Sequence, residues 1–232
     1  MTDTETLDDL VRRVDPDRWL ASRFIADPAA RGDVIALTAF NYELARVAGG
    51  VTNALMGEIR LTWWREAMDE LALGKAPRKH PTVEAVAAAD LDPVALAAMA
   101  EARLSDLDEA PLADEARVLA YVDATAGAWA VLVARRLDPS SDPHAVKGAA
   151  RAYGLAGLSR LQRLPPAWTQ AEVSARVAAQ LRLARTEARG LPIAAFPAVA
   201  TAALARGLVA GRAPSELEKK ARLTWSVATG RL

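Results

Sequence analysis

Aspartate–proline pairs recur along this chain and restrict its fold more than any other feature. They occur at Asp15-Pro16, Asp27-Pro28, Asp92-Pro93 and Asp142-Pro143. An aspartate at the N-cap accepts main-chain N–H bonds, and a proline at the first helical position loses no hydrogen bond. Each pair therefore predicts the start of a helix. Two capping-box patterns, Thr169 with Glu172 and Ser215 with Glu218, predict two further starts.

The alanine content and the residues that mark helix ends also favour helices. The chain is rich in alanine, and Gly74, Gly190 and Gly211 stand where helices are expected to end. The most apolar stretch, 191–209, contains two prolines and is expected to form a kinked buried helix. The predicted helices span 5–14, 16–26, 29–48, 52–73, 82–89, 93–109, 113–137, 143–164, 170–189, 192–210 and 215–228. We therefore expect an all-α fold.

Length and composition favour one large helical domain, residues 1–232. The apolar fraction of 52% is sufficient for a sizeable core. Lysine plus arginine equals aspartate plus glutamate, 29 each. This zero net charge argues against general nucleic-acid binding, because that affinity comes mainly from neutralising phosphates.

The chain lacks cysteine, which excludes disulfides, thiolate metal sites and a cysteine nucleophile. His80 and His144 each lie beside a proline and are interpreted as solvated loop residues, and the basic segment 74–81 as a solvated connection. The acidic N-terminal segment does not resemble a signal peptide. No stretch reaches the roughly 18 apolar residues of a membrane span. We expect a cytoplasmic protein without a transmembrane segment, and peripheral membrane contact stays open.

Two neighbouring helices carry polar residues within apolar faces. Asn41 and Glu43 interrupt the apolar stripes of the predicted helix 29–48. A buried carboxylate is costly unless it is paired, so we expect Glu43 to be mostly buried and bonded to a basic or donor group, with Arg60 or Arg65 of the next helix as the leading candidates. The first interpretation is a structural ion pair. The alternative is a remnant polar pocket.

Five segments, taken in order, resemble the squalene/phytoene synthase family. They are LASR at 20–23, ALTAFNYELAR at 36–46, GEIRLTWWREAMDEL at 57–71, YVDATAG at 121–127 and GLAGLSRLQRL at 154–164. The resemblance implies a shortened isoprenoid-synthase-like helical bundle around a cavity, and the head-to-head condensation of two prenyl diphosphates. In that family two aspartate-rich motifs bind magnesium ions, and these hold the diphosphate.

Both motif positions depart from the family pattern. The residues that match the first motif are Ala45, Arg46 and Gly49, and the second stretch, 161–166, reads LQRLPP. Neither contains a carboxylate, and Arg46 would repel a metal ion. We therefore expect no catalytic residues, no metal site and no cofactor. Magnesium would be required only if an atypical site exists.

Other acids are not expected to replace these motifs. Asp106, Asp108 and Glu109 form one acidic group, and Asp8 and Asp9 form another. Neither group is interleaved with an apolar stripe, and acids near helix ends are usually solvated or capping. Both groups are therefore interpreted as surface or capping residues.

The same matching gives a set of residues expected to line a cavity or ligand site. They are Arg23, Asn41, Glu43, Ala45, Arg60, Trp64, Tyr121, Gly127 and Arg163. A glycine inside a helix costs about 1 kcal/mol relative to alanine, so Gly127 predicts a close helix contact or a cavity wall. Tyr121 is interpreted first as a core residue and second as a ligand contact.

One branch of the family resembles this chain further. The mitochondrial complex I assembly factor branch also has an Ala-Phe-Asn-x-Glu-Leu string, matched here by 39–44. Three hypotheses follow. The preferred one is a pseudoenzyme that serves as an assembly or interaction factor, with a protein partner or an isoprenoid-like lipid. The others are a magnesium-dependent prenyl transferase with an atypical metal site, and a purely structural helical protein.

Overall fold

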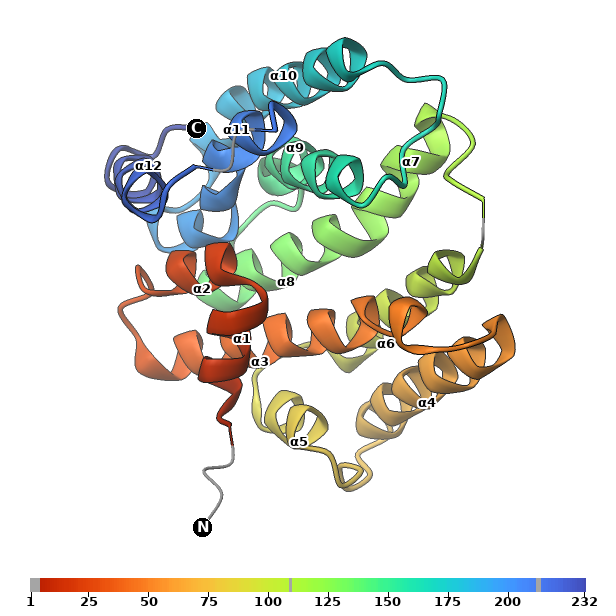
Figure 1. Ribbon diagram of the computed structural model, residues 1–232. Coiled ribbons are helices and arrows are strands. Elements are labelled where there is room, and N and C mark those ends of the chain that lie inside the picture. The colour runs from red at the N-terminus through yellow and green to blue at the C-terminus, as the bar shows by residue number, and fades with distance from the viewer. Residues whose placement is uncertain (1–4, 109, 212–213) are drawn as a thin grey trace. The chain divides into compact units, whose positions relative to one another are not determined.

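The computed structural model describes residues 5–108, 110–211 and 214–232 and is helical throughout, with no strand in these ranges (Figure 1). The α-helices are α1 Leu7–Val14, α2 Pro16–Ser22, α3 Pro28–Ala45, α4 Ala54–Ala72, α5 Pro81–Ala88, α6 Pro93–Ala102, α7 Glu115–Val122, α8 Ala128–Leu137, α9 His144–Arg160, α10 Gln170–Glu187, α11 Ala205–Val209 and α12 Glu216–Thr229. The all-α prediction is confirmed.

The aspartate–proline pairs begin helices as predicted. Asp15, Asp27 and Asp92 are the N-caps of α2, α3 and α6, and each carboxylate accepts a main-chain N–H of the first turn. Where α9 begins, Asp142 Oδ1 accepts from the main-chain nitrogen of His144 at 2.9 Å. The reciprocal capping box predicted at the start of α10 is also formed.

Several predicted helices are shorter or more broken than expected, and two of them have a clear local cause. The stretch predicted as one kinked helix, 192–210, forms 3₁₀ segments at Ile193–Ala198 and Ala200–Leu204 before α11. Pro197 lies inside the first segment, where its missing N–H opposes a regular α-helix. Helix α9 ends at Arg160, because the chain then turns through a left-handed residue, Gln162 (φ 55°).

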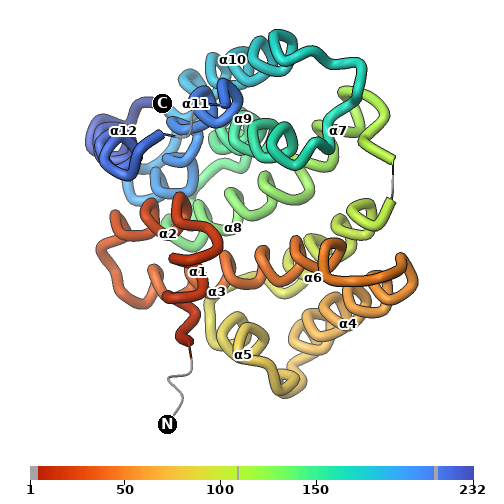
Figure 2. Tube along the Cα trace, viewed as in Figure 1, coloured from red at the N-terminus to blue at the C-terminus, as the bar shows by residue number. Residues whose placement is uncertain are grey.

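The chain divides into two compact helical units, Met1–Glu109 and Ala110–Leu232. That the whole chain forms a single domain stays a prediction. In the first unit α1 packs on α3 through Val11, Ile35 and Ala39. Within the same unit α4 runs along α6, and α3 contacts α5 (Figure 2).

In the second unit two glycines of α9 allow neighbouring segments to approach closely. A Cβ at Gly148 would lie 2.8 Å from the main-chain nitrogen of Ala184 in α10, and one at Gly154 would lie 2.5 Å from Val122 Cγ1. At Gly127 the nearest atoms belong to its own turn, with Val122 O at 3.4 Å from the added Cβ. The close helix contact predicted at Gly127 is therefore wrong, and Gly148 and Gly154 provide such contacts instead.

One helical run, Glu115–Leu137, has the length and apolar composition needed to cross a membrane. Core helices of soluble proteins share these properties. The run comprises α7, a π-helical turn at Asp123–Gly127 and α8, and Asp123 at its middle is ion-paired with Arg151. The absence of a transmembrane segment stays a prediction.

Candidate functional site

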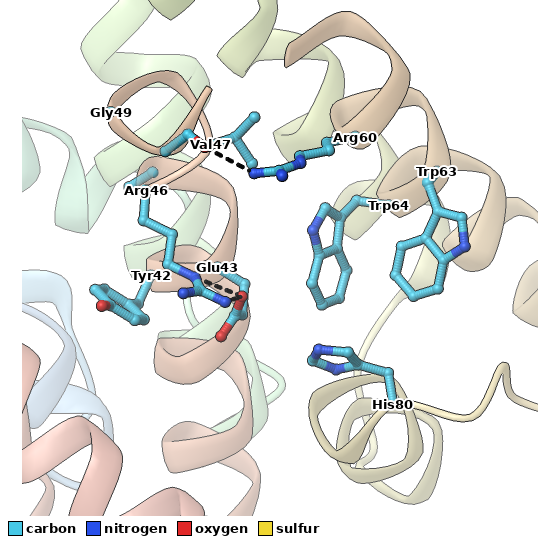
Figure 3. A pocket seen from close by; sticks show the side chains of 11 residues that line it. Tyr42, Glu43, Arg46, Val47, Gly49, Arg60, Trp63, Trp64 and His80 are labelled. Atoms are coloured by element: carbon cyan, nitrogen blue, oxygen red, sulfur yellow. Dashed lines mark hydrogen bonds and ion pairs between the residues drawn. The ribbon is translucent and has the colours of Figure 1, made fainter. Parts of the chain in front are cut away.

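The first unit contains an open pocket of about 770 Å³ formed by α3, α4 and the residues around the start of α5. In Figure 3 the side chains of α3 stand on one side, those of α4 stand opposite, and His80 points in from the third element. The lining residues are Tyr42, Glu43, Ala45, Arg46, Val47, Gly49, Gly50, Arg60, Trp63, Trp64 and His80. We call this the aromatic pocket.

Edge-to-face aromatic contacts build one wall of the aromatic pocket. The ring of Trp64 lies 5.6 Å from that of Phe40, 5.0 Å from that of Trp63 and 4.8 Å from that of His80. Trp64 is buried, with 5% exposure. Such geometry is favourable between aromatic rings and adds to the gain from burial. The wall is therefore part of the core of the first unit as well as a lining of the pocket.

His80 has a defined structural place. It is the N-cap of α5, and its Nδ1 accepts from the main-chain nitrogen of Thr82 at 3.2 Å. An accepting Nδ1 leaves Nε2 as the protonated nitrogen of a neutral ring. The residue is half-buried against Trp63 and Trp64. The prediction of a solvated loop histidine is wrong for His80, whereas His144 is exposed as expected.

The basic segment before His80 folds back onto α4. Arg78 pairs with Glu70 at 2.8 Å and with Glu66 at 3.2 Å, and its guanidinium lies 5.3 Å from the ring centre of Trp63. The hydrogen bond from Arg78 lowers the pKa of the Glu70 carboxyl. Residues 74–77 and Lys79 are exposed, as predicted for a solvated connection, whereas Arg78 ties the segment to α4.

The polar wall of the aromatic pocket centres on Glu43. The residue is buried, with 8% exposure, and its Oε2 accepts from Nε and Nη2 of Arg46, both at 2.8 Å. The predicted burial and bonding of Glu43 are confirmed, but the predicted partners are wrong. Arg65 pairs with Glu101 at 2.8 Å, and Arg60 donates to the main-chain oxygen of Gly50 at 3.0 Å. Arg46 is the partner because it lies one turn along the same helix.

One acid of each group considered as a replacement for the family motifs, and Asp123 of segment 121–127, are also held by arginines. The ion pairs are Asp8–Arg23 at 2.6 Å, Asp106–Arg103 at 3.2 Å and Asp123–Arg151 at 2.6 Å. For the Asp8 carboxyl, burial by itself raises the pKa, but hydrogen bonds from Trp19 and Arg23 outweigh it and lower the pKa. Glu109, which belongs to the same acidic group as Asp106, lies outside the described residues.

The fourth segment that resembles the family, 121–127, contains a π-helical turn. Thr125 Oγ1 donates to the main-chain oxygen of Tyr121 at 2.8 Å, one turn back along the helix. Asp123 receives two bonds from Arg151, at 2.7 and 2.6 Å, and this carboxylate raises the pKa of Arg151. Such turns are frequent at functional sites. Here the only carboxylate of the turn is already satisfied by an arginine of α9.

The nine residues predicted to line a cavity are placed in different parts of the fold. Four of them line the aromatic pocket, namely Glu43, Ala45, Arg60 and Trp64. Asn41 is buried on α3 and its Oδ1 accepts from Arg103 at 3.1 Å. The guanidinium of Arg23 lies 4.6 Å from the ring centre of Trp19. Tyr121, Gly127 and Arg163 belong to the second unit. That these nine residues contact a ligand stays a prediction.

Sequence reasoning missed several lining residues of the aromatic pocket, including Tyr42, Trp63 and His80. A usable signal existed for His80. The residue precedes Pro81, and a polar residue before a proline at the first helical position predicts an N-cap. This would have placed the imidazole at a helix start and not in a free loop.

The described residues do not suit the magnesium cluster that the family resemblance implies. Over residues 5–108, 110–211 and 214–232, no group of three or more histidine or carboxylate side chains could hold a metal ion. Magnesium requires oxygen ligands, commonly carboxylates. At the residues matched to the first motif, the guanidinium of Arg46 is bonded to the carboxylate of Glu43. At the second, the chain has already left α9 and turns at Gln162.

Comparison with known proteins matches this chain to a family model and to solved structures. A model of the squalene/phytoene synthase family matches residues 11–160. A solved structure described as a dehydrosqualene synthase in complex with ligand superimposes with a TM-score of 0.78 over 97% of this chain and 94% of that chain, at 13% identity. The sequence matches no curated protein. The structural likeness shows that the chain has the all-α isoprenoid-synthase fold.

Proposed function

Because this chain belongs to the squalene/phytoene synthase family, we propose that it is a catalytically degenerate member that acts by binding. On this proposal it does not condense prenyl diphosphates. It serves as an assembly or interaction factor that holds a protein partner or an isoprenoid-like lipid. It needs no magnesium for this role.

The proposal rests on carboxylates that are ion-paired with arginines. Ionising a diphosphate requires its developing negative charge to be neutralised, and the family uses metal-bound carboxylates for this purpose. In this chain Glu43, Asp106 and Asp123 each face a guanidinium within 3.2 Å. A carboxylate already paired with arginine has lost most of its attraction for a cation. Binding a metal would require these ion pairs to be broken.

The aromatic pocket supports a binding role. Its wall of Trp63, Trp64 and His80 offers apolar and aromatic surface, and Arg60 and Tyr42 add polar groups at the side. Ligand pockets commonly combine a largely apolar lining with a few polar groups, in volumes of roughly 300–1,000 Å³. The volume of about 770 Å³ falls within that range. An amphipathic ligand such as an isoprenoid lipid has matching chemistry.

The start of α4 supports an interaction surface beside the pocket. Leu55, Met56 and Ile59 are all exposed there. Met56 lies one turn before Arg60 on the same side of the helix, so apolar surface continues outward from a pocket residue. Exposed apolar groups of this kind are commonly found where proteins contact partners or membranes.

The direct test is a condensation assay. The purified protein is incubated with farnesyl or geranylgeranyl diphosphate, Mg²⁺ and NADPH, and products are sought by mass spectrometry. We expect no squalene, phytoene or cyclopropyl intermediate, while an active family enzyme in the same assay gives product. A product that appears with this protein and disappears without Mg²⁺ would show that the chain is a working prenyl transferase.

A binding measurement complements that assay. Calorimetry with a non-hydrolysable prenyl diphosphate analogue is performed with and without Mg²⁺. Any affinity is expected to be the same in both conditions, because the described residues form no carboxylate cluster that could recruit the metal. An Mg²⁺-dependent gain in affinity would contradict the proposal even if no product is formed.

A further inference from the structure

The second unit contains a smaller pocket of about 210 Å³ whose charged lining is made of arginines. They are Arg185 of α10, Arg206 of α11, Arg222 of α12, and Arg231, which follows α12. We call this the arginine pocket. Over the described part of the chain, no acidic side chain lines it. The whole chain has zero net charge, so this gathering of cations is a local feature.

Local geometry brings the arginines together. Arg222 and Ser226 are four residues apart and lie on the same side of α12. Gly230 ends the helix in the left-handed region (φ 62°), where a side chain is disfavoured. The turn returns the chain toward α10, where Arg185 Nε donates to the main-chain oxygen of Leu232 at 2.8 Å. Arg231 is placed at the pocket by this turn.

Two of the four arginines, Arg206 and Arg231, have no ion-pair partner among the described residues. Arg222 pairs with Glu218 at 2.7 Å. Arg185 bonds to a main-chain oxygen, and for the guanidiniums of Arg206 and Arg231 the described part of the chain supplies neither an ion pair nor a hydrogen bond. Like charges gathered around one concavity repel one another and attract an anion.

A buried hydroxyl gives a second, independent indication of a ligand. Ser226 is 1% exposed and lines the arginine pocket, and its Oγ has no hydrogen-bond partner among the described residues. A buried polar group without a partner is costly, and most such groups in proteins are satisfied by protein, water or ligand. A ligand oxygen in the pocket would supply the missing partner.

We propose that the arginine pocket binds a small phosphate-type anion, either free phosphate or the phosphomonoester group of a larger molecule. Guanidinium groups match phosphate oxygens in pairs, which gives both affinity and geometric selectivity. The volume of about 210 Å³ is below the roughly 300–1,000 Å³ of pockets for drug-sized ligands, so it suits a single anionic group. Trp225, 65% exposed, offers apolar surface at the rim for the rest of a larger ligand. This site is independent of the function proposed for the aromatic pocket.

The test is calorimetric titration of the intact protein with inorganic phosphate, with chloride used to hold the ionic strength constant. We expect saturable binding of one phosphate per chain. Replacing Arg206 with glutamine is expected to weaken binding by about tenfold or more, as the loss of a charge-assisted hydrogen bond does. The same loss is expected for Arg231→Gln. Both side chains are exposed, so these variants are expected to fold normally.

A matched control is available on α10. Arg182 is exposed, lies one turn before Arg185 and does not line the arginine pocket. Arg182→Gln removes the same charge from the chain and is expected to bind phosphate like the parent protein. If Arg182→Gln and Arg206→Gln weaken binding equally, the effect is general charge attraction and the proposed site is wrong. Absence of any saturable phosphate binding would also refute it.

Two further titrations identify the source of the phosphate group. Glycerol 3-phosphate represents a soluble phosphomonoester, and vesicles containing phosphatidic acid represent a lipid headgroup, with phosphatidylcholine vesicles as the control. Binding of either probe that is lost in Arg206→Gln supports the site and tells which form it takes. Vesicle binding that persists in Arg206→Gln would contradict a headgroup role.

Discussion

Both pockets place arginine beside tryptophan, but they differ in how the arginines are satisfied. In the aromatic pocket Arg46 is bonded to Glu43 and Arg60 to the main-chain oxygen of Gly50. In the arginine pocket, Arg206 and Arg231 have neither kind of partner among the described residues. An arginine therefore signals an anion site only where the fold leaves it without a carboxylate.

The tryptophans of the two pockets also differ, in how far each is buried. Trp64 of the aromatic pocket is buried among Phe40, Trp63 and His80, whereas Trp225 of the arginine pocket stands 65% exposed. The aromatic pocket is thus built from the core of the first unit, and its lining contributes to stability. In the arginine pocket Arg185, Arg206, Trp225 and Arg231 are exposed side chains that contribute little to stability and remain available for a ligand, above a buried floor that includes Ser226.

Replacing the two tryptophans with alanine gives the largest expected difference between the pockets. Trp64→Ala is expected to lower the free energy of unfolding by about 3–5 kcal/mol, because it leaves a cavity among packed rings. Trp225→Ala is expected to change it by less than about 0.5 kcal/mol. Urea unfolding followed by circular dichroism measures both. Equal losses would show that Trp225 packs more tightly than its exposure indicates.

A pair of glycines tests how rigid the packing of each unit is. An added Cβ at Gly148 would meet main-chain atoms of α10, Ala184 N at 2.8 Å and Gln180 O at 3.0 Å, whereas at Gly57 it would meet the side-chain tip of Leu107. A leucine tip can rotate away, but helix backbone cannot. Gly148→Ala is expected to cost about 1–3 kcal/mol from overpacking.

The effect at Gly57 is expected to be smaller. Both glycines lie inside helices, so the gain of about 1 kcal/mol from alanine's helix propensity is common to both variants. The difference in stability between the two variants therefore reports the cost of overpacking alone. A melting temperature lowered as much by Gly57→Ala as by Gly148→Ala would show that Leu107 cannot move.

The ion pair of the aromatic pocket should respond unequally to loss of its two members. Arg46→Ala leaves the buried carboxylate of Glu43 unpaired and is expected to cost about 1–3 kcal/mol. Glu43→Ala leaves an arginine whose side chain is 57% exposed and can turn to water, so the expected cost is about 1 kcal/mol. Chemical denaturation of the two variants gives the ranking. A larger loss of stability in Glu43→Ala than in Arg46→Ala would mean that Arg46 depends more on the ion pair than Glu43 does.

The Asp8–Arg23 pair gives the smallest effect, which depends on pH. The pKa of Asp8 is lowered in the folded state, so its contribution to stability is fully present above the ordinary carboxyl pKa of about 3.9 and is lost as pH falls through the lower folded value. Asp8→Asn should therefore melt below the parent at neutral pH and converge with it in acid. Thermal melts across that range measure the difference, and a constant offset would contradict the assignment.

Helix caps and other local sequence patterns predicted much of the fold, because the groups that bond in them lie within a few residues of each other. The caps at Asp15, Asp27 and Asp92 formed as expected, since each carboxylate bonds within its own first turn. The burial of Glu43 also followed from its place within an apolar stripe. Its partner did not follow, because Arg46, Arg60 and Arg65 were all near enough in sequence. The fold places Arg60 on Gly50 and Arg65 on Glu101, which leaves the i+3 neighbour Arg46 for Glu43.

Long-range contacts escaped sequence reasoning. Arg65 pairs with Glu101, 36 residues away, and Arg103 reaches Asn41 over 62 residues. The residues near either arginine in the sequence do not indicate its partner. The π-helical turn near Gly127 was likewise missed, and a glycine expected to mark a close contact marks a change in helical winding instead.

The sequence by itself determined the helical class, most helix starts and the absence of carboxylates at the residues matched to the two family motifs, because capping chemistry and residue identity are local properties. Only the tertiary structure decided which acids are neutralised and where arginines are left without them. Arg185 and Arg231 lie 46 positions apart in the chain, and they line one pocket because α12 ends at a left-handed glycine and the chain turns back toward α10. Electrostatic pairing depends on distance in space, and packing sets that distance.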